Sequence, residues 1–378
     1  MNQSIMTVPL KLLELPWVAQ TEVINKMSIL DIIKFSLSSP DLFSIAKSAN
    51  RRVGEIHWCF GDDEAVSEIQ LIEKKEEVEF SLEFPSPEEL EESREKCCKG
   101  QQYSDVFTKL TIQGVTVFLS STQQNANCPY YQTVVVDYVE PSKEHQTKVM
   151  KMFTEHIWTL SKYRGHGLYY SSTNRIIVCW VFDFTTQFSC LVIDNESSED
   201  KMTAQEIQWL LETVKCDDVF FRPPVPKDRA YLGPLTTKYI HMEHAEWLSL
   251  ESLLNSEVVD ILIFKDSLRD AELNMIIRKW MDGGLPKLQS FVMEFQDPLV
   301  HSRNIVFNGV NHAPADETTR PPYFYDYIRE DWARNEDAVD IKSNDGKLTA
   351  TVTMGKMYGD GIFGMFVWHE KYNLKTDD

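Results

Sequence analysis

The first part of the chain carries apolar residues at helical spacing in three short stretches. Helices are predicted to begin near Pro16, Ser28 and Ser39, because proline suits the first helical position and serine caps helix starts. The apolar positions are Val23, Ile24, Met27, Ile32, Ile33, Phe35, Leu37, Leu42, Phe43, Ile45, Ala46 and Ala49. Three helices of this size cannot bury them all, since a domain below about 60 residues has little interior. A partner surface or the next domain should cover the remainder.

The middle of the chain has the pattern of strands with few helices. Val, Thr, Phe and Tyr are concentrated in residues 106–119 and 131–139, which should form antiparallel ribbons. Residues 175–193 have the pattern of two strands broken near residues 185–187. One amphipathic helix is predicted from the spacing of Val149, Met152, Phe153, Ile157 and Leu160.

From about residue 203 the pattern changes to helix followed by strand. Thr203 opens a helix with a capping box. Strand-like runs then recur at residues 219–221, 239–241, 261–264 and 290–293, at steps of about 20 to 28 residues, which is within the range of leucine-rich repeats. This region fits degenerate repeats whose neighbours bury one another, and it equally fits an ordinary α/β domain.

These patterns predict an α+β fold, in keeping with a length of 378 residues, which suggests two to three domains. We expect a three-helix domain over residues 1–58, a mixed strand and helix domain over 59–200, and leucine-rich-repeat-like helix/strand units ending in a β-hairpin over 201–378. The charge supports the first boundary. Residues 1–58 hold six Lys and Arg against five Asp and Glu, whereas the whole chain has a net charge of -20.

The acidic charge of the remainder disfavours nucleic acid as a partner, because a field of that sign repels phosphate backbones. Residues 61–95 alone hold 14 acidic and three basic residues around alternating apolar positions. This arrangement predicts a strand with a solvated acidic face, and an acidic docking site is the alternative.

Membrane insertion and secretion are not expected. The longest apolar run, residues 176–182, is far below the roughly 20 residues that span a bilayer, and Lys11 and Glu14 interrupt the apolar amino terminus. The seven cysteines include no C-x-x-C pair, which fits reduced thiols. We therefore expect a cytoplasmic or nuclear protein, or one found in both compartments.

Searches for chemistry-bearing motifs give no catalytic, metal or cofactor site. Residues 359–364 match G-x-G-x-x-G, but a strand pattern follows and no βαβ unit can, so a hairpin or bulge is predicted. His241, Glu243 and His244 could offer metal ligands, although a polar loop after a strand is the better interpretation. We expect no enzyme activity and no cofactor.

The amino-terminal pattern resembles the F-box, a short helical motif, in the order of its residues from Leu15-Pro16 to Phe43. The resemblance implies binding to the Skp-family adaptor of cullin-RING ubiquitin ligases. The residues implied in this contact are Leu15, Pro16, Val23, Ile24, Met27, Ile32, Phe35 and Leu37. A plain three-helix cap without a partner is the alternative.

The carboxyl-terminal region resembles the F-box-associated domain (type 2) of the large nematode F-box families. The resemblance lies in residues 247–254, 259–264, 273–284 and 286–288, and at the carboxyl end in residues 340–341, 345–347, 349–353 and 366–368. The two resemblances occur in the expected order. They imply a non-catalytic receptor of an SCF-type ligase that holds an unidentified protein substrate, and the open alternatives are an α/β enzyme or an interaction protein that works without a ligase.

Overall fold

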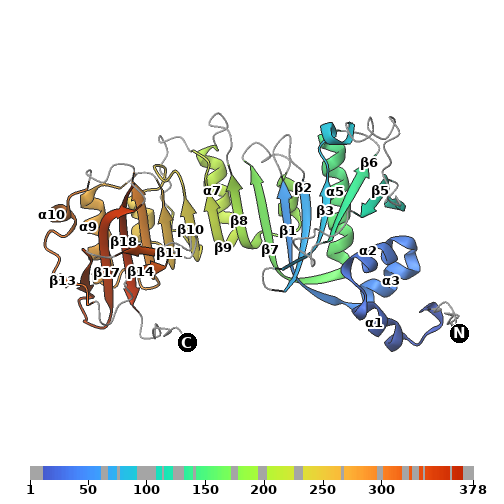
Figure 1. The fold of residues 1–378 in the computed structure, drawn as a ribbon, viewed down its shortest axis with the longest axis horizontal. Helices are drawn as coiled ribbons and strands as arrows, with labels where there is room; N and C mark the ends of the chain where they lie inside the picture. The colour runs from blue at the N-terminus through green and yellow to red at the C-terminus, as the bar shows by residue number, and fades with distance from the viewer. Residues whose placement is uncertain are drawn as a thin grey trace, which may run out of the picture. The chain divides into compact units, whose positions relative to one another are not determined.

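The computed structural model describes residues 12–60, 67–74, 77–91, 108–112, 115–121, 132–138, 142–171, 178–194, 202–224, 233–264, 268–295, 301–316, 323–325, 332–334, 337–357 and 360–368. The chain divides into two compact units, which are coloured along the sequence in Figure 1. The first unit comprises Met1–Tyr170 and Asn174–Phe184, and the second comprises Ser171–Thr173 and Thr185–Asp378.

The first unit begins with helices and continues directly into a sheet. The helices are η1 (Leu12–Glu14), α1 (Trp17–Lys26), α2 (Ile29–Ser38) and α3 (Pro40–Ala49). Asn50, in the left-handed conformation with φ 51°, is the single residue between α3 and β1 (Arg51–Phe60). The predicted domain boundary at residue 58 therefore falls inside a strand, and the helices share one compact unit with the sheet.

The sheet of the first unit is mixed. Its other strands are β2 (Ser67–Lys74), β3 (Glu77–Phe84), β4 (Thr108–Ile112), β5 (Val115–Ser121), β6 (Gln132–Tyr138) and β7 (Ser161–Ser171). The order is β7-β1-β2-β3-β6-β5-β4, with β1 parallel to β7 and β3 parallel to β6. The antiparallel ribbons predicted over residues 106–119 and 131–139 correspond to β4, β5 and β6. A short helix over residues 87–91 follows β3.

Helix α5 (Lys143–Leu160) packs on one face of this sheet. Its apolar side is buried, and the buried Trp58 of β1 donates from Nε1 to Thr154 Oγ1 at 3.0 Å. The rings of Phe84 and Phe153 meet edge to face at 5.9 Å. The amphipathic helix predicted around residues 149–160 is thus the core helix of this unit.

The strand predicted at the start of residues 175–193 is wrong where the structure describes it. Residues Cys179–Asp183 form the 3-10 helix η3, and only β8 (Gln187–Asp194) is a strand. Trp180 of η3 lies edge-on to Phe60 at 6.0 Å and to Phe184 at 5.8 Å. Aromatic packing against β1 therefore outweighs the strand propensity of this stretch.

The second unit also contains both parallel and antiparallel strands. Its strands are β8, β9 (Lys215–Phe221), β10 (Tyr239–Met242), β11 (Asp260–Ile263), β12 (Ser290–Phe295), β13 (His312–Pro314), β16 (Val339–Lys342), β17 (Thr349–Met357) and β18 (Asp360–Trp368). They lie in the order β8-β9-β10-β11-β12-β18-β17-β16-β13, and β17 and β18 form the predicted closing hairpin. A separate hairpin joins β14 (Tyr323–Tyr325) and β15 (Trp332–Arg334).

Strands β8 to β12 are parallel and follow one another in space as they do in sequence. The helices between them are α7 (Ala204–Thr213), α8 (Leu250–Leu254) and α9 (Asp270–Met281), and α10 (Arg303–Val306) follows β12. Asp218, Tyr239, Asp260 and Ser290 pair in register, at steps of roughly 20 to 30 residues. The alternation of helix and strand is observed, while the assignment to leucine-rich repeats stays a prediction.

The protein is therefore mixed α/β, as the sequence predicts at that level. Among the described helices, none is long and apolar enough to cross a bilayer. The G-x-G-x-x-G run has a packing explanation: Gly361 and Gly364 lie in β18, where a Cβ on Gly361 would collide with the ring of Phe295.

Candidate docking surface

The amino-terminal helices are held in shape by local hydrogen bonds. Ser28 Oγ accepts from the Asp31 N–H at 3.1 Å and Ser39 Oγ from the Leu42 N–H at 3.2 Å, so both helix starts are capped. Gln20 Nε2 donates to Leu15 O at 2.9 Å, which ties the segment before α1 to the helix. Local hydrogen bonds within the segment thus fix the helix starts.

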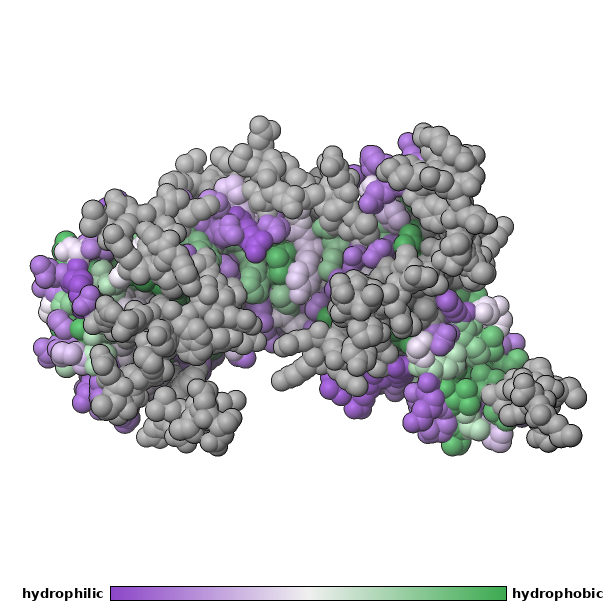
Figure 2. All heavy atoms as spheres, viewed as in Figure 1, coloured by the Kyte–Doolittle hydropathy of each residue, from purple (hydrophilic) through white to green (hydrophobic). Residues whose placement is uncertain are grey.

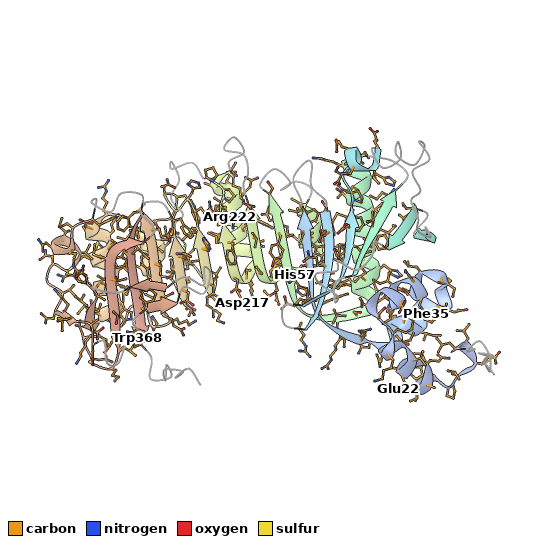
Figure 3. The ribbon with its side chains drawn as sticks, in the orientation of Figure 1. Glu22, Phe35, His57, Asp217, Arg222 and Trp368 are labelled. Atoms are coloured by element: carbon orange, nitrogen blue, oxygen red, sulfur yellow. The ribbon has the colours of Figure 1, made fainter. Side chains whose placement is uncertain are left out.

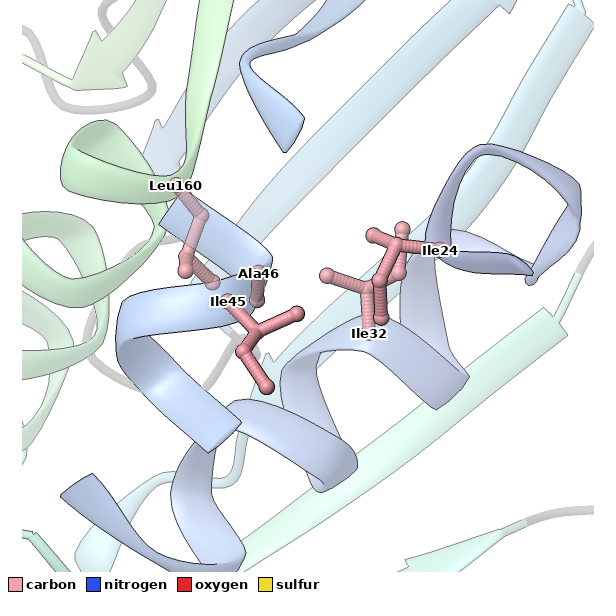
Figure 4. Close-up of a cluster of buried hydrophobic side chains, with 5 residues drawn as sticks. All are labelled: Ile24, Ile32, Ile45, Ala46 and Leu160. Carbon is pink, nitrogen blue, oxygen red and sulfur yellow. The ribbon is translucent and has the colours of Figure 1, made fainter. Parts of the chain in front are cut away.

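The helices build a small core that is completed from outside the predicted F-box. Figure 4 shows its members, Ile24, Ile32, Ile45, Ala46 and Leu160, all buried. Leu160 is the last residue of α5. This contact agrees with the expectation that the next domain covers part of the apolar surface.

Polar and aromatic contacts strengthen this attachment to α5. Ser36 Oγ and His156 Nε2 lie 2.7 Å apart, and the rings of Phe43 and His156 are 5.1 Å apart. Burial lowers the pKa of His156 from 6.5 to about 4, so the imidazole is neutral at pH 7. In addition, Arg51 Nη1 donates to Met27 O at 2.5 Å. The three helices therefore keep a fixed orientation within the first unit.

An apolar surface remains exposed on the start of these helices. Leu13, Trp17 and Val18 are 57%, 54% and 71% exposed, and they are half of the large exposed apolar side chains among the described residues. Figure 2 shows hydrophobic residues gathered over this part of the first unit. We call Leu13, Trp17 and Val18 the apolar patch; its clustering is a feature of interaction sites.

A shallow depression of about 490 Å³ lies on the same helix, α1. Glu22, Val23, Lys26 and Met27 line it. One acidic and one basic side chain thus frame an apolar floor, which could receive an apolar side chain of a partner. Figure 3 shows Glu22 on α1 and Phe35 on α2.

The predicted adaptor-binding residues fall into two groups. Pro16 is exposed, and Leu15, Val23, Met27, Phe35 and Leu37 are half-buried. Ile24 and Ile32 have 0% and 2% of their surface exposed, so in the free protein they support the helices from inside. Direct contact with a partner therefore rests on the first group, and the adaptor contact itself stays a prediction.

Sequence reasoning missed the apolar patch. Leu13, Trp17 and Val18 flank the Leu15-Pro16 pair directly, and Trp17 and Val18 lie outside the spacing of the buried positions. Large apolar residues on the polar side of an amphipathic helix are the signal that could have found them.

The described residues offer no site for metal chemistry. No group of three or more His, Cys, Asp or Glu side chains in this part of the chain could hold a metal ion. His241 is a buried residue of β10 between Phe220, at 5.2 Å, and Phe264, at 4.6 Å between ring centres. This histidine thus packs between aromatic rings of the neighbouring strands.

One family comparison locates its match in the second unit. Residues 233–293 match the family described as F-box associated, over a segment that runs from before β10 into β12. A curated relative, E3 ubiquitin-protein ligase hecw-1 of Caenorhabditis elegans, is 33% identical over 60 residues, which are 16% of this chain and 5% of the relative. The chain thus spans a small part of the length of that relative. No solved structure matches significantly. The family match supports an F-box-associated domain in the carboxyl-terminal part of the chain.

Proposed function

We propose that this chain is a substrate-recognition subunit of an SCF-type cullin-RING ubiquitin ligase. In this proposal the helices α1 to α3 bind a Skp-family adaptor, and the second unit holds the protein to be modified. The F-box-associated match at residues 233–293 supports this role, and a relative with a ubiquitin-ligase name is consistent with it.

The observation that carries the proposal is the apolar patch at the start of α1. An exposed tryptophan beside an exposed leucine and valine costs free energy in water, and a partner surface would remove that cost. The adjoining depression on α1 extends the apolar area. Exposed apolar side chains in η1 and at the start of α1 offer anchors to a partner with an apolar surface.

The attachment of the helices to α5 gives the docked adaptor a defined orientation. Leu160 and His156 both belong to α5, and β1 follows α3 after a single residue. A bound adaptor would therefore be held rigidly to the sheet of the first unit. Such a link suits a receptor whose task is to position another protein, and it needs no chemistry from this chain.

The test is co-purification of the intact chain with a Skp-family adaptor. The variant Leu13→Ala with Trp17→Ala and Val18→Ala should lose the adaptor. Trp209→Ala is the matched control, because Trp209 is 44% exposed on α7 of the second unit. Equal recovery of adaptor with both proteins, or its absence with the unmodified chain, would show that α1 is not an adaptor-binding helix.

A finer test asks whether the complex is a ligase. Cullin should appear with the adaptor in the same purification and should be lost with it in the triple variant. Adaptor without cullin would instead indicate an F-box protein that acts outside a ligase.

A further inference from the structure

The parallel strands of the second unit have two different faces. Successive residues of a strand point to opposite sides, so the pairing register assigns each residue to a face. The buried residues of one side are Leu191, Ile193, Val219, Phe221, Ile240, Met242, Ile261 and Ile263. Helices α7 and α9 lie on one side of these strands (Figure 1), and the continuous buried row is the one expected beneath them, which we call the helix side.

The opposite side of β8 to β11, which we call the open face, is only partly covered. Its half-buried residues are Cys190, Val192, Asp194, Asp218, Phe220, Arg222, Tyr239, Glu243, Asp260 and Phe264, and its buried residues are Phe188, Cys216, His241 and Leu262. Phe220, His241 and Phe264 are in ring contact across three strands. The open face thus has an aromatic centre that is still partly accessible.

Charged groups lie at both ends of the strands around this aromatic centre. Figure 3 shows Asp217 and Arg222 at opposite ends of β9. The carboxylates of the open face are Asp194, Asp218, Glu243 and Asp260, and its cation is Arg222; Asp217 and Lys238 lie at its edge. Arg222 already pairs with Asp194 at 2.8 Å and lies 3.3 Å from Glu243. The surplus charge of the open face is therefore negative.

The ammonium group of Lys238 already lies against an aromatic ring and near carboxylates. Lys238 Nζ lies 4.6 Å from the centre of the Tyr239 ring. The hydrogen bond with Tyr239, and then the charges of Asp217 and Asp218, raise the pKa of Lys238. Lys238 is exposed, so its side chain can yield this position to another cation.

We propose that the open face binds a basic segment of the target protein, in which Lys or Arg residues flank a large apolar anchor. The anchor would pack on Phe220 and Phe264, and the basic side chains would meet Asp218 and Asp260 at one end and Glu243 at the other. The inference rests on the proposed receptor function and names the class of its substrate. Nucleic acid does not fit, because the same carboxylates would repel its phosphates.

The charges at the two ends of the open face should act mainly by matching the opposite charges of the bound segment. Exposed ion pairs each contribute only modestly, so two of them together should change affinity by about fivefold. The aromatic centre should contribute more, because partly buried rings are typical binding anchors. Loss of Phe220 should therefore weaken binding by tenfold or more.

The probe is a random peptide library displayed on phage and selected on the intact chain. The selected peptides should combine an excess of Lys and Arg with at least one large apolar residue. The affinity of a synthetic copy should fall about fivefold for Asp218→Asn with Glu243→Gln, and tenfold or more for Phe220→Ala. Both variants must show an unchanged thermal unfolding transition. If Phe220→Ala fails to fold, the charge variant still tests the proposal, because Asn and Gln keep the shapes of the side chains that they replace.

The matched control is Glu212→Gln with Glu251→Gln, two exposed carboxylates on α7 and α8 away from the open face. Its affinity should stay within about twofold of the unmodified chain. Acidic or uncharged selected peptides, no selected peptide, or equal losses in both double variants would overturn the inference. Adaptor co-purification on the same preparations separates the two proposals: peptide binding without adaptor refutes only the adaptor assignment, and adaptor without peptide binding refutes only the open-face assignment.

Discussion

Replacing Trp17 by alanine tests the apolar patch with a magnitude that follows from the structure. A tryptophan side chain presents at most about 250 Å². Trp17 is 54% exposed, so docking could remove about 130 Å² from water, or about 3 kcal/mol at 25 cal/mol per Å². Association recovers only part of this, so Trp17→Ala should weaken adaptor binding by roughly thirtyfold to a hundredfold.

The contrasting variant is Ile24→Ala, which should act through a different property. Ile24 has no exposed surface and lies in the core of the helices, so its truncation should lower the free energy of unfolding by about 2–5 kcal/mol. Trp17→Ala should change that free energy by less than about 0.5 kcal/mol, because surface substitutions usually do. One variant therefore reports on docking and the other on folding.

Titration calorimetry with purified adaptor measures the affinity, and urea denaturation followed by circular dichroism measures the stability. Trp209→Ala in the second unit controls for the loss of an exposed tryptophan. The reasoning is refuted if Trp17→Ala binds adaptor within about twofold of the unmodified chain. It is also refuted if Trp17→Ala unfolds as easily as Ile24→Ala, since Trp17 would then be a core residue.

Three further predictions concern stability. Burial lowers the pKa of His156 from 6.5 to about 4, so the neutral imidazole is favoured in the folded protein. The resulting contribution to stability is present above pH 6.5 and is lost as pH falls toward 4. Between pH 7 and 5 the free energy of unfolding should fall by about 2 kcal/mol for this reason, and His156→Gln should remove that dependence in denaturation curves. Gly361→Ala should cost about 1–3 kcal/mol by collision with the Phe295 ring, and an unchanged melting curve would contradict the close packing of β18. Thr203→Ala should cost about 1 kcal/mol by loss of the α7 cap, whereas Thr203→Ser, measured in parallel, should be nearly neutral.

Local signals in the sequence located the helices well. Ser28, Ser39 and Thr203 cap the helix starts that they predict, because capping depends on residues within one turn. The wrong strand near Trp180 shows the limit of such signals. Its helical conformation depends on Phe60, which is distant in sequence and adjacent in space.

The candidate surface was predictable only in part. The spacing of apolar residues marks Ile24 and Ile32 as members of one helical face, but the same spacing describes a buried core and a docking surface. Only the tertiary contact with Leu160 distinguishes the buried core from the exposed surface, and Trp17 lies outside that core. The open face could not be predicted from the sequence either. Alternate side chains of β8 and β9 form one surface only because the two strands pair in parallel and in register.

The packing of Leu160 into the buried cluster of α1 to α3 has a consequence for synthesis of the chain. The helices α1 to α3 leave the ribosome before α5, and their core lacks Leu160 until α5 has also emerged. At about 5–20 residues per second, the roughly 110 residues between α3 and Leu160 take roughly 5–20 s to be made. During that time the apolar side of a nascent, half-finished helical bundle faces water. These helices should therefore be most open to chaperones, and to premature association, before the rest of the first unit exists.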